Sequence, residues 1–267
     1  MPKENIGQKS MRLIRASLFH FVFTLYHVVA CVVCLPFLLT TRARIRALVQ
    51  MHLRIVAFLE RMIMGLDYEV RGREYLPDQG AFLVAAKHQS AYETFKLHFL
   101  FDDPAIVLKQ ELLRIPLWGR FLSALSPIAI DRTQGRSAIE QIIAGANQAK
   151  DQGRAIVIFP QGTRVSITQS PAEKPYKIGI VRMQEATNLP IIPMALNSGY
   201  FWPRRGWGLR SGKVIFEFLP PLTLGTTPQE TLQKLEHVLE DASLRLVAEA
   251  SGHFNDRDNF NNSNNAP

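Results

Sequence analysis

Residues 16 to 41 contain no Asp, Glu, Lys or Arg, and this uncharged stretch constrains the fold more than any other feature. As an α-helix it would extend about 36 Å, enough to cross a hydrocarbon core of about 30 Å. A secretory signal peptide is the alternative, but the stretch is too long and has no small-residue cleavage site. His20 and His27 weaken the case for a simple span, and Pro36 would kink it.

Basic residues flank the uncharged stretch on both sides. Positive charge on two flanks leaves the membrane orientation open. It also suits a segment that enters and returns on one face, with the arginines on anionic headgroups. We therefore expect membrane attachment, by either a span or a re-entrant hairpin. The basic residues concerned are Lys3, Lys9, Arg12 and Arg15 before the stretch and Arg42, Arg44 and Arg46 after it.

The chain of 267 residues carries a formal net charge of +8. Such an excess favours an anionic partner, which can be nucleic acid, an anionic membrane surface or a phosphorylated substrate. Cys31 and Cys34 are the only cysteines, so a disulfide framework is disfavoured and a reducing compartment is the simpler assumption. Their spacing could indicate a redox or zinc pair. No further cysteine completes a zinc site, which favours two small hydrophobic residues facing the membrane.

The apolar spacing of residues 42–66 predicts an amphipathic helix that links the membrane anchor, residues 1–66, to a folded domain. From residue 67 to 250, short apolar runs alternate with helical patterns. This alternation predicts an α/β fold with a central, mostly parallel sheet flanked by helices. We expect the Asn-rich tail, residues 251–267, to be disordered. Expected strands lie within 81–86, 105–109, 126–132, 154–160, 190–196 and 213–219, and expected helices begin near 91, 137, 177 and 227.

The expected helix starts near 137 and 227 carry capping signals in the sequence. Ser137 and Glu140 form a capping box, and Thr227 followed by Pro228 and Glu230 predicts a capped N-terminus.

His88 follows a buried apolar run, and Glu93 lies five residues further on, in "KHQSAYETF". Ligand crevices of open α/β sheets lie at the carboxyl ends of strands, which is where His88 is expected. There a neutral imidazole can accept a proton from an attacking hydroxyl, and Glu93 can orient the ring. Ser90 and Glu93 also form a capping box at a helix start. The two interpretations are compatible, because the cap folds Glu93 back toward His88.

Further polar groups follow other strands. In "FPQGTR", Gly162 allows close backbone approach and Arg164 offers a planar fork for phosphate, although a strand-exit turn explains the same residues. Lys109 and Arg132 end two more apolar runs, where a solvated strand end and a surface ion pair with Asp131 are the alternatives. The "NSG" of Asn197 to Gly199 is typical of a turn.

Four short sequence blocks, each of which follows or contains an expected strand, occur in an order that resembles the glycerolipid acyltransferase family. The particular resemblance is to the bacterial type of 1-acyl-sn-glycerol-3-phosphate acyltransferase, and the apolar, basic N-terminus also fits that family. The resemblance covers residues 66 to 222. "KHQSAYETF" looks like the H-x4-D block, "GRFLSALSPIAIDR" like the second block, "FPQGTR" like F-P-E-G-T-R, and "IIPMALNSG" like V-P-V-A-L-N-S-G. It implies an acyltransferase domain in residues 67–250.

The resemblance also implies roles for individual residues. His88 would remove the proton from the sn-2 hydroxyl of lysophosphatidic acid, oriented by Glu93. The alcohol would attack the thioester of an acyl-CoA or acyl carrier protein, without a covalent acyl-enzyme, a metal or another cofactor. The substrate phosphate would be held by Lys109, Arg132, Gln161, Gly162, Thr163 and Arg164. The Ile192–Pro193 segment is associated with the acyl-donor side or with the shape of the site. The expected location is the bacterial inner membrane, with the active site facing the cytoplasm.

The sequence departs from the family pattern at two positions. Glu93 replaces the usual Asp and can still accept from an imidazole N–H. Gln161 replaces the usual Glu, which leaves the loop around Arg164 more positive. No G-x-S-x-G elbow and no metal-spaced His/Cys set is present, which disfavours a serine hydrolase or a metalloenzyme. His52 and His98 lie on helical patterns and are interpreted as packing or surface residues.

Two alternative functions remain from the sequence. The first keeps the acyl transfer and changes the acceptor to another lysolipid, such as lyso-ornithine lipid. The second is a basic membrane-surface module that binds anionic lipid or nucleic acid without chemistry. The net charge of +8 permits the second, but the aromatic–basic interleaving of single-strand binding proteins is absent, so no nucleic-acid partner is expected.

Overall fold

A computed structural model describes residues 6–204 and 208–252, so the expected tail lies outside the described residues except for its first two positions. Within these ranges seven strands form one sheet in the order β1-β7-β6-β2-β5-β3-β4. Neighbouring strands are parallel except β6 and β7. The predicted mostly parallel sheet is confirmed. The strands are β1 (Leu66–Arg71), β2 (Leu83–Ala86), β3 (Ala105–Lys109), β4 (Ile128–Ile130), β5 (Ile156–Ile158), β6 (Ile191–Leu196) and β7 (Gly212–Phe218).

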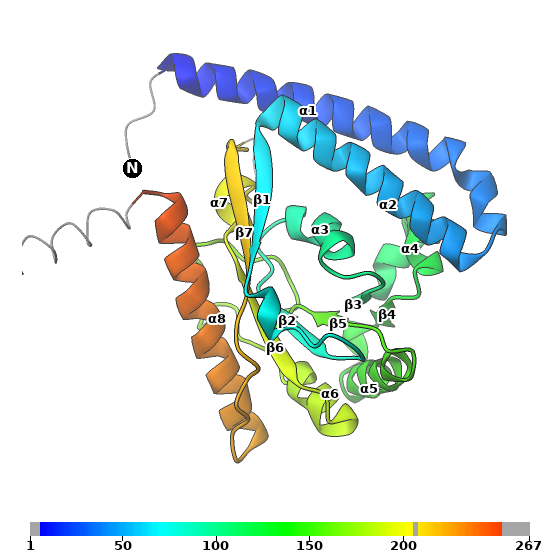
Figure 1. Ribbon diagram of the computed structural model, residues 1–267, viewed down its shortest axis with the longest axis vertical. Coiled ribbons are helices and arrows are strands. Elements are labelled where there is room, and N and C mark those ends of the chain that lie inside the picture. The colour runs from blue at the N-terminus through cyan, green and yellow to red at the C-terminus, as the bar shows by residue number, and fades with distance from the viewer. Residues whose placement is uncertain (1–5, 205–207, 253–267) are drawn as a thin grey trace, which may run out of the picture.

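Helices cover both faces of this sheet (Figure 1). On one face Val84 and Ala86 of β2 pack in a core with α1 and α3, and on the other Leu83 and Ala85 pack with α5, α6 and α8. A strand that is apolar on both sides is what a parallel strand between two helical layers requires. Apart from the N-terminal ones, the helices are α3 (Tyr92–Leu100), α4 (Trp118–Ala124), α5 (Arg136–Asp151), α6 (Gly179–Thr187), α7 (Ser198–Phe201) and α8 (Pro228–Ala250), with short turns at Arg73–Tyr75, Gln110–Arg114 and Arg132–Gln134.

The first strand, β1, was not predicted. Among the described strands it lies at the edge of the sheet and pairs with β7 alone, and its residues after Leu66 are half-buried. Its mixed sequence, "LDYEVR", carries no continuous apolar run. Pairing with β7, which is more than 140 positions away in the chain, decides its conformation.

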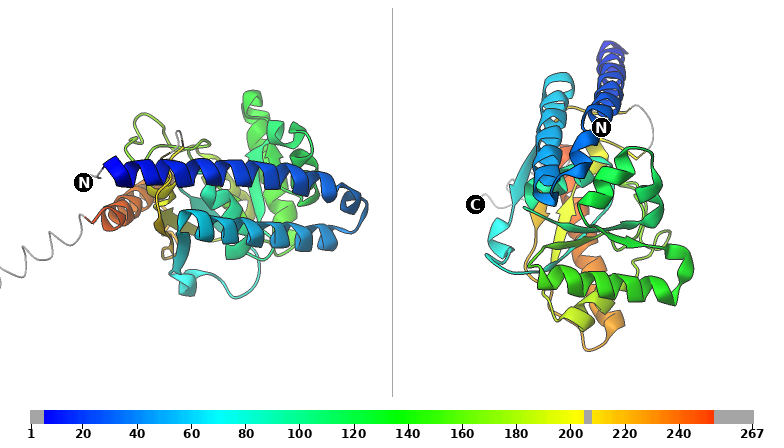
Figure 2. Two further views of the ribbon diagram at one scale, coloured as in Figure 1. Left: turned by 90° about the horizontal axis from the view of Figure 1, so that it is seen from above. Right: turned by 90° about the vertical axis from the view of Figure 1, so that its right-hand side faces the viewer.

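The N-terminal residues form a helical hairpin and not one long helix over 16–41. Helix α1 (Ile6–Val33) begins earlier than expected, and the chain turns through a 3-10 segment (Leu35–Leu39) whose first turn contains Pro36. Proline has no N–H to continue the α-helical bonding, which explains the end of α1. Helix α2 (Arg42–Leu59) then returns beside α1 in the opposite direction (Figures 1 and 2). A single π-helical turn, Glu60–Met64, leads to β1, so the predicted helix over 42–66 ends before Leu66.

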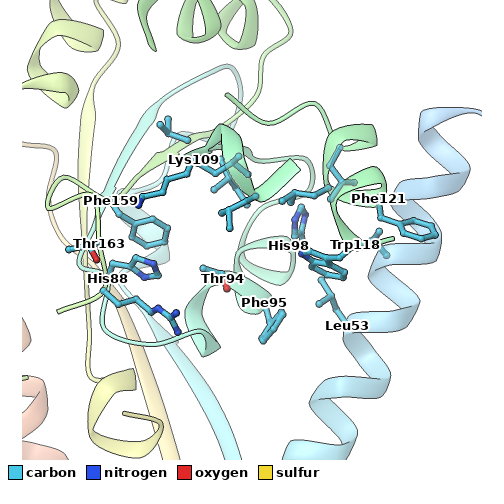
Figure 3. Close-up of a pocket in the computed structure, with 18 of the residues that line it drawn as sticks. Leu53, His88, Thr94, Phe95, His98, Lys109, Trp118, Phe121, Phe159 and Thr163 are labelled. Carbon is cyan, nitrogen blue, oxygen red and sulfur yellow. The ribbon is translucent and has the colours of Figure 1, made fainter. Parts of the chain in front are cut away.

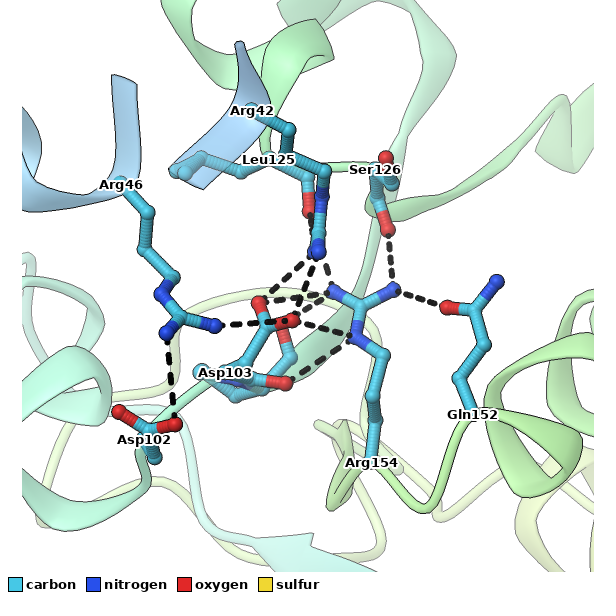
Figure 4. A network of polar contacts seen from close by, with 9 residues as sticks. Arg42, Arg46, Asp102, Asp103, Leu125, Ser126, Gln152 and Arg154 are labelled. Carbon is cyan, nitrogen blue, oxygen red and sulfur yellow. Dashed lines mark hydrogen bonds and ion pairs between the residues drawn. The ribbon is translucent and has the colours of Figure 1, made fainter. Parts of the chain in front are cut away.

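A partly buried arginine–aspartate network joins the hairpin to the α/β domain (Figure 4). Both Nη atoms of Arg42, at the start of α2, donate to the Asp103 carboxylate at 2.8 Å. Arg154, which is only 7% exposed, lies 3.4 Å from the same carboxylate and donates to the carbonyls of Leu125 and Ser126. Arg46 of α2 lies 3.5 Å from the same carboxylate, so Asp103 lies among three guanidinium groups and anchors the turn end of the hairpin to the domain.

One predicted helix cap is confirmed and one is wrong. Thr227 accepts from the Glu230 N–H at 3.1 Å and starts α8 as expected. In α5 the capping residue is Gly135, so Ser137 lies inside the first turn and caps nothing. Glu140 is instead 3.5 Å from Arg136, an exposed ion pair one turn apart.

Candidate active site

A cavity of about 570 Å³ lies where β2, β3, β4 and β5 end, between the sheet, α3, α4 and the hairpin (Figure 3). Its volume is typical of a site for a small organic ligand. The cavity has a polar end and an apolar end. The polar end contains His88, Lys109, Arg132, Gly162, Thr163 and Arg164, and the apolar end includes Phe23, Val49, Leu53, Phe95, Trp118 and Phe121.

His88 and Glu93 are in direct contact at the polar end. Nδ1 of His88 lies 2.8 Å from Oε1 of Glu93. Glu93 is fully buried, whereas His88 is 17% exposed and lines the cavity. A carboxylate only accepts, so the ring proton is on Nδ1 and Nε2 keeps its lone pair for the cavity. This is the arrangement that a general base requires.

The same carboxylate also accepts the backbone N–H groups of Gln89 and Ser90 at 2.7 Å each. Ser90 Oγ in turn accepts from the Tyr92 N–H at 3.1 Å. The structure therefore combines the two sequence interpretations of Glu93, since one oxygen holds both the turn before α3 and the imidazole of His88.

Two further contacts of this pair were not anticipated from the sequence. The hydroxyl of Ser198 donates to Oε2 of Glu93 at 2.6 Å, and both side chains are fully buried. The Phe159 ring stacks on His88 with centroids 4.1 Å apart. The sequence signals were present, as Ser198 lies in the fourth block and Phe159 in the third, but "NSG" alone is typical of a turn.

The 159–164 loop is tied to the neighbouring strand exits. The Nη1 group of Arg132 donates to the carbonyl of Gly162, which has a positive φ of 68° that favours glycine. The backbone N–H of Val165 donates to the His88 carbonyl at 2.7 Å. Burial lowers the pKa of Arg132 from its usual value, but a guanidinium remains charged at neutral pH. Gly162, Arg132 and His88 are therefore held around one opening.

The other predicted site residues separate into two groups. Lys109 is exposed and extends over the cavity toward Phe159, and Thr163 lies beside His88 (Figure 3). Arg164 is exposed and also lines the cavity. Gln161 is buried outside it and donates to the Lys174 carbonyl at 3.0 Å, so it stabilises the following loop. Ile192 and Pro193 are buried in β6 and do not line the cavity.

His98 is a polar group near the apolar end, beside Trp118 (Figure 3). Burial lowers the pKa of His98 to about 4, so its ring is neutral at pH 7. Within residues 6–204 and 208–252 no hydrogen bond reaches this ring. The sequence predicted a packing or surface role for His98, and the structure adds that its imidazole contributes to the cavity wall.

A base, a set of cations and an apolar compartment in one cavity define a class of enzyme. The polar end can accept a proton from a hydroxyl and bind an anionic group, while the apolar end can hold a hydrocarbon chain. These are the requirements of a transferase that acts on a phosphorylated amphiphile.

Comparisons with known proteins agree with this class. The family model described as Acyltransferase matches residues 67–197. A 1-acyl-sn-glycerol-3-phosphate acyltransferase of Pseudomonas aeruginosa is 38% identical over 180 residues, 67% of this chain and 67% of that protein. One of Saccharomyces cerevisiae is 25% identical over 191 residues, 71% of this chain and 62% of the relative. The chain therefore belongs to the acyltransferase family that contains the 1-acyl-sn-glycerol-3-phosphate acyltransferases.

A solved structure has the same fold. The crystal structure of the 1-acyl-sn-glycerophosphate acyltransferase PlsC from Thermotoga maritima matches with a TM-score of 0.68. The match covers 90% of this chain and 98% of that chain at 22% identity. The N-terminal helices and the α/β domain therefore form an arrangement that a solved protein also has.

Proposed function

We propose that the protein transfers a fatty acyl group to the sn-2 hydroxyl of lysophosphatidic acid and so forms phosphatidic acid. The observation that carries the proposal is the shared cavity of His88 with Lys109, Arg132 and Arg164, which continues into apolar walls. Membership of the acyltransferase family supports the same reaction.

In the proposed mechanism, Nε2 of His88 accepts the hydroxyl proton as the oxygen attacks the thioester carbonyl. The negative charge of Glu93 stabilises the imidazolium that forms. The tetrahedral intermediate collapses, the C–S bond breaks, and the imidazolium returns its proton to the leaving thiolate. Lys109, Arg132 and Arg164 hold the phosphate, so the hydroxyl is placed beside the base.

The co-substrate is an acyl thioester, either acyl-CoA or acyl carrier protein. Side chains handle both the proton and the phosphate charge in this mechanism, so it needs no further cofactor. The apolar end of the cavity, between α2, α3 and α4, is the proposed compartment for the acyl chain.

The hairpin is the proposed contact with the membrane, at the cytoplasmic face of a bacterial inner membrane. Of the described segments, Lys9–Val33 alone is long and apolar enough to cross a bilayer. One face of this helix packs on the domain. There Phe19 is fully buried, and its ring centroid lies 5.4 Å from that of Trp202. Attachment along one face favours a helix lying in the interface over one that crosses. The outward apolar side chains include Phe21, Leu25, Val28, Val32, Met51, Ile55, Phe58 and Met62.

The direct test is product formation by purified protein in detergent, given lysophosphatidic acid and either donor, with the product identified by mass. His88→Ala is expected to lower kcat by about 10²- to 10⁴-fold, the usual effect of losing a general base. His237→Ala is the matched control, because His237 is exposed on α8 and is not among the residues that line the cavity. Near-normal activity of His88→Ala would refute the mechanism.

A panel of lysolipids tests the acceptor. A lysolipid without the phosphate, such as lyso-ornithine lipid, is expected to react poorly because the three cations lose their ligand. Equal rates with both acceptors would show that the phosphate is not required, and that the protein acylates lysolipids more broadly.

A further inference from the structure

The buried carboxylate of Glu93 receives four hydrogen bonds, but they are unevenly shared. Three donors, Nδ1 of His88 and the N–H groups of Gln89 and Ser90, reach Oε1. Among the described residues, the Ser198 hydroxyl is the one donor to Oε2, at 2.6 Å. Ser198 is 105 residues away from Glu93 in the chain and begins α7 at the end of β6.

We propose that Ser198 is a positioning residue for the acyl transfer, acting through Glu93 on the His88 base. The inference rests on the proposed function for its catalytic consequence. A Glu side chain has one more rotatable bond than the Asp usual in the family, so one hydrogen-bonded oxygen leaves it freer to turn. A donor on the second oxygen fixes the plane of the carboxylate and keeps Oε1 on the imidazole.

Burial gives the Ser198 hydroxyl a second effect. Glu93 is fully buried, and a buried carboxylate without donors is disfavoured in its charged form. The hydroxyl hydrogen bond favours the charged form, which is the one that steadies an imidazolium. Ser198 does not line the cavity, so its action on the substrate is indirect.

A neighbouring contact shows that the whole fourth block is docked on the first. The N–H of Gly199 donates to Oε1 of the Gln89 side chain at 3.0 Å. A Cβ at position 199 would lie 2.9 Å from the Gln89 Cβ, closer than real Cβ contacts allow. Glycine at this position therefore lets Ser198 approach Glu93. In this chain the "NSG" segment is therefore more than a turn, because it supports the turn that carries His88.

The test compares Ser198→Ala with Ser243→Ala, assayed with lysophosphatidic acid and an acyl-CoA over pH 5 to 9. Ser243 is equally buried, on α8, and its hydroxyl has no partner among the described residues, so its loss is expected to be harmless. Ser198→Ala is expected to lower kcat on the order of 10- to 100-fold, with both KM values within about twofold.

A kcat of Ser198→Ala within about twofold of that of Ser243→Ala overturns the proposal. A raised KM with unchanged kcat also overturns it, because it would indicate substrate contact. The Glu93→Gln background adds a check, since Ser198→Ala should change little once the charge is gone.

A second readout does not depend on activity and separates this inference from the proposed function. The histidine rings are labelled with ¹⁵N, and the ring signals of His88, assigned from their loss in His88→Ala, are recorded by NMR. Ser198→Ala is expected to change the ¹⁵N chemical shifts of the His88 ring, because the carboxylate in contact with Nδ1 loses the donor on its second oxygen, and to leave the shifts of His237 unchanged. Unchanged His88 shifts overturn the positioning role, even if the wild type makes phosphatidic acid. Changed shifts support it, even if the acceptor is another lysolipid.

Discussion

The Arg132 guanidinium donates to the Gly162 carbonyl, so the second and third sequence blocks meet at the polar end of the cavity. Arg132 is half-buried there, while Lys109 and Arg164 are exposed. A cation that is already oriented by a backbone carbonyl loses less entropy on binding an anion than a free surface side chain.

Arg132→Met is expected to raise the KM for lysophosphatidic acid on the order of 10- to 100-fold, with a smaller change in kcat. The substitution keeps the apolar length of the side chain and removes the charge. Arg136→Met is the control, since Arg136 is exposed on α5. Initial rates at varied lysophosphatidic acid measure the effect. An unchanged KM would remove Arg132 from the phosphate site.

Glu93→Asp introduces the residue usual in the family and is nevertheless expected to lower kcat about 10- to 100-fold. The side chain is one methylene shorter, so it cannot reach Nδ1 of His88 and the Ser198 hydroxyl from the same backbone position. Glu93→Gln is expected to lose more, on the order of 10³- to 10⁴-fold, because it removes the charge. Steady-state kcat measures both, and Glu236→Asp on α8 serves as the control. A wild-type kcat in Glu93→Asp would show that the shorter carboxylate still reaches both His88 and Ser198.

His98→Leu is expected to raise kcat/KM for saturated long-chain donors about 3- to 10-fold. A saturated chain beside His98 leaves the imidazole without a hydrogen-bond partner, and leucine removes that penalty. A donor with a hydroxyl that reaches the ring should show the opposite change. The wild-type preference should be constant from pH 6 to 9, since the pKa of about 4 keeps the ring neutral throughout. Competition between a saturated and a hydroxylated acyl donor measures the ratio of their kcat/KM values. The same ratio in the wild type and in His98→Leu would contradict the prediction.

Lys96→Met is expected to destabilise the fold by about 3–5 kcal/mol, because it leaves Glu60 buried without its ion-pair partner. Glu60 and Lys96 are each 1% exposed. The double variant Glu60→Gln/Lys96→Met should recover most of the loss. Denaturant unfolding followed by circular dichroism measures all three proteins. Equal losses in the single and double variants would mean that the pair is not coupled.

The same pair gives a pH dependence with a defined sign. Burial raises the pKa of Glu60 to about 7 from a usual value near 4.5. Between these values the folded state binds more protons at Glu60 than the unfolded chain, so this contribution to stability declines as pH rises. Without the Lys96 ammonium the carboxyl holds its proton to still higher pH. The deficit of Lys96→Met should therefore be larger at pH 8 than at pH 5.

Local sequence patterns were sufficient for the α/β class and for the polar end of the cavity. Buried parallel strands have near-continuous apolar runs, and such strands end at a common edge. His88, Lys109, Arg132 and the loop before Arg164 each follow an apolar run, so their meeting was predictable. Short-range capping joined Glu93 to the same turn.

The tertiary structure decided the features that depend on distant contacts. Edge strand β1 depends on pairing with β7, the hairpin on packing against the domain, and the orientation of Gln161 on a carbonyl at position 174. The contact of Ser198 with Glu93 crosses 105 positions of the chain. A sequence pattern reports the local period and burial of a segment. Only the folded chain brings a hydroxyl from the end of β6 to the second oxygen of a buried carboxylate.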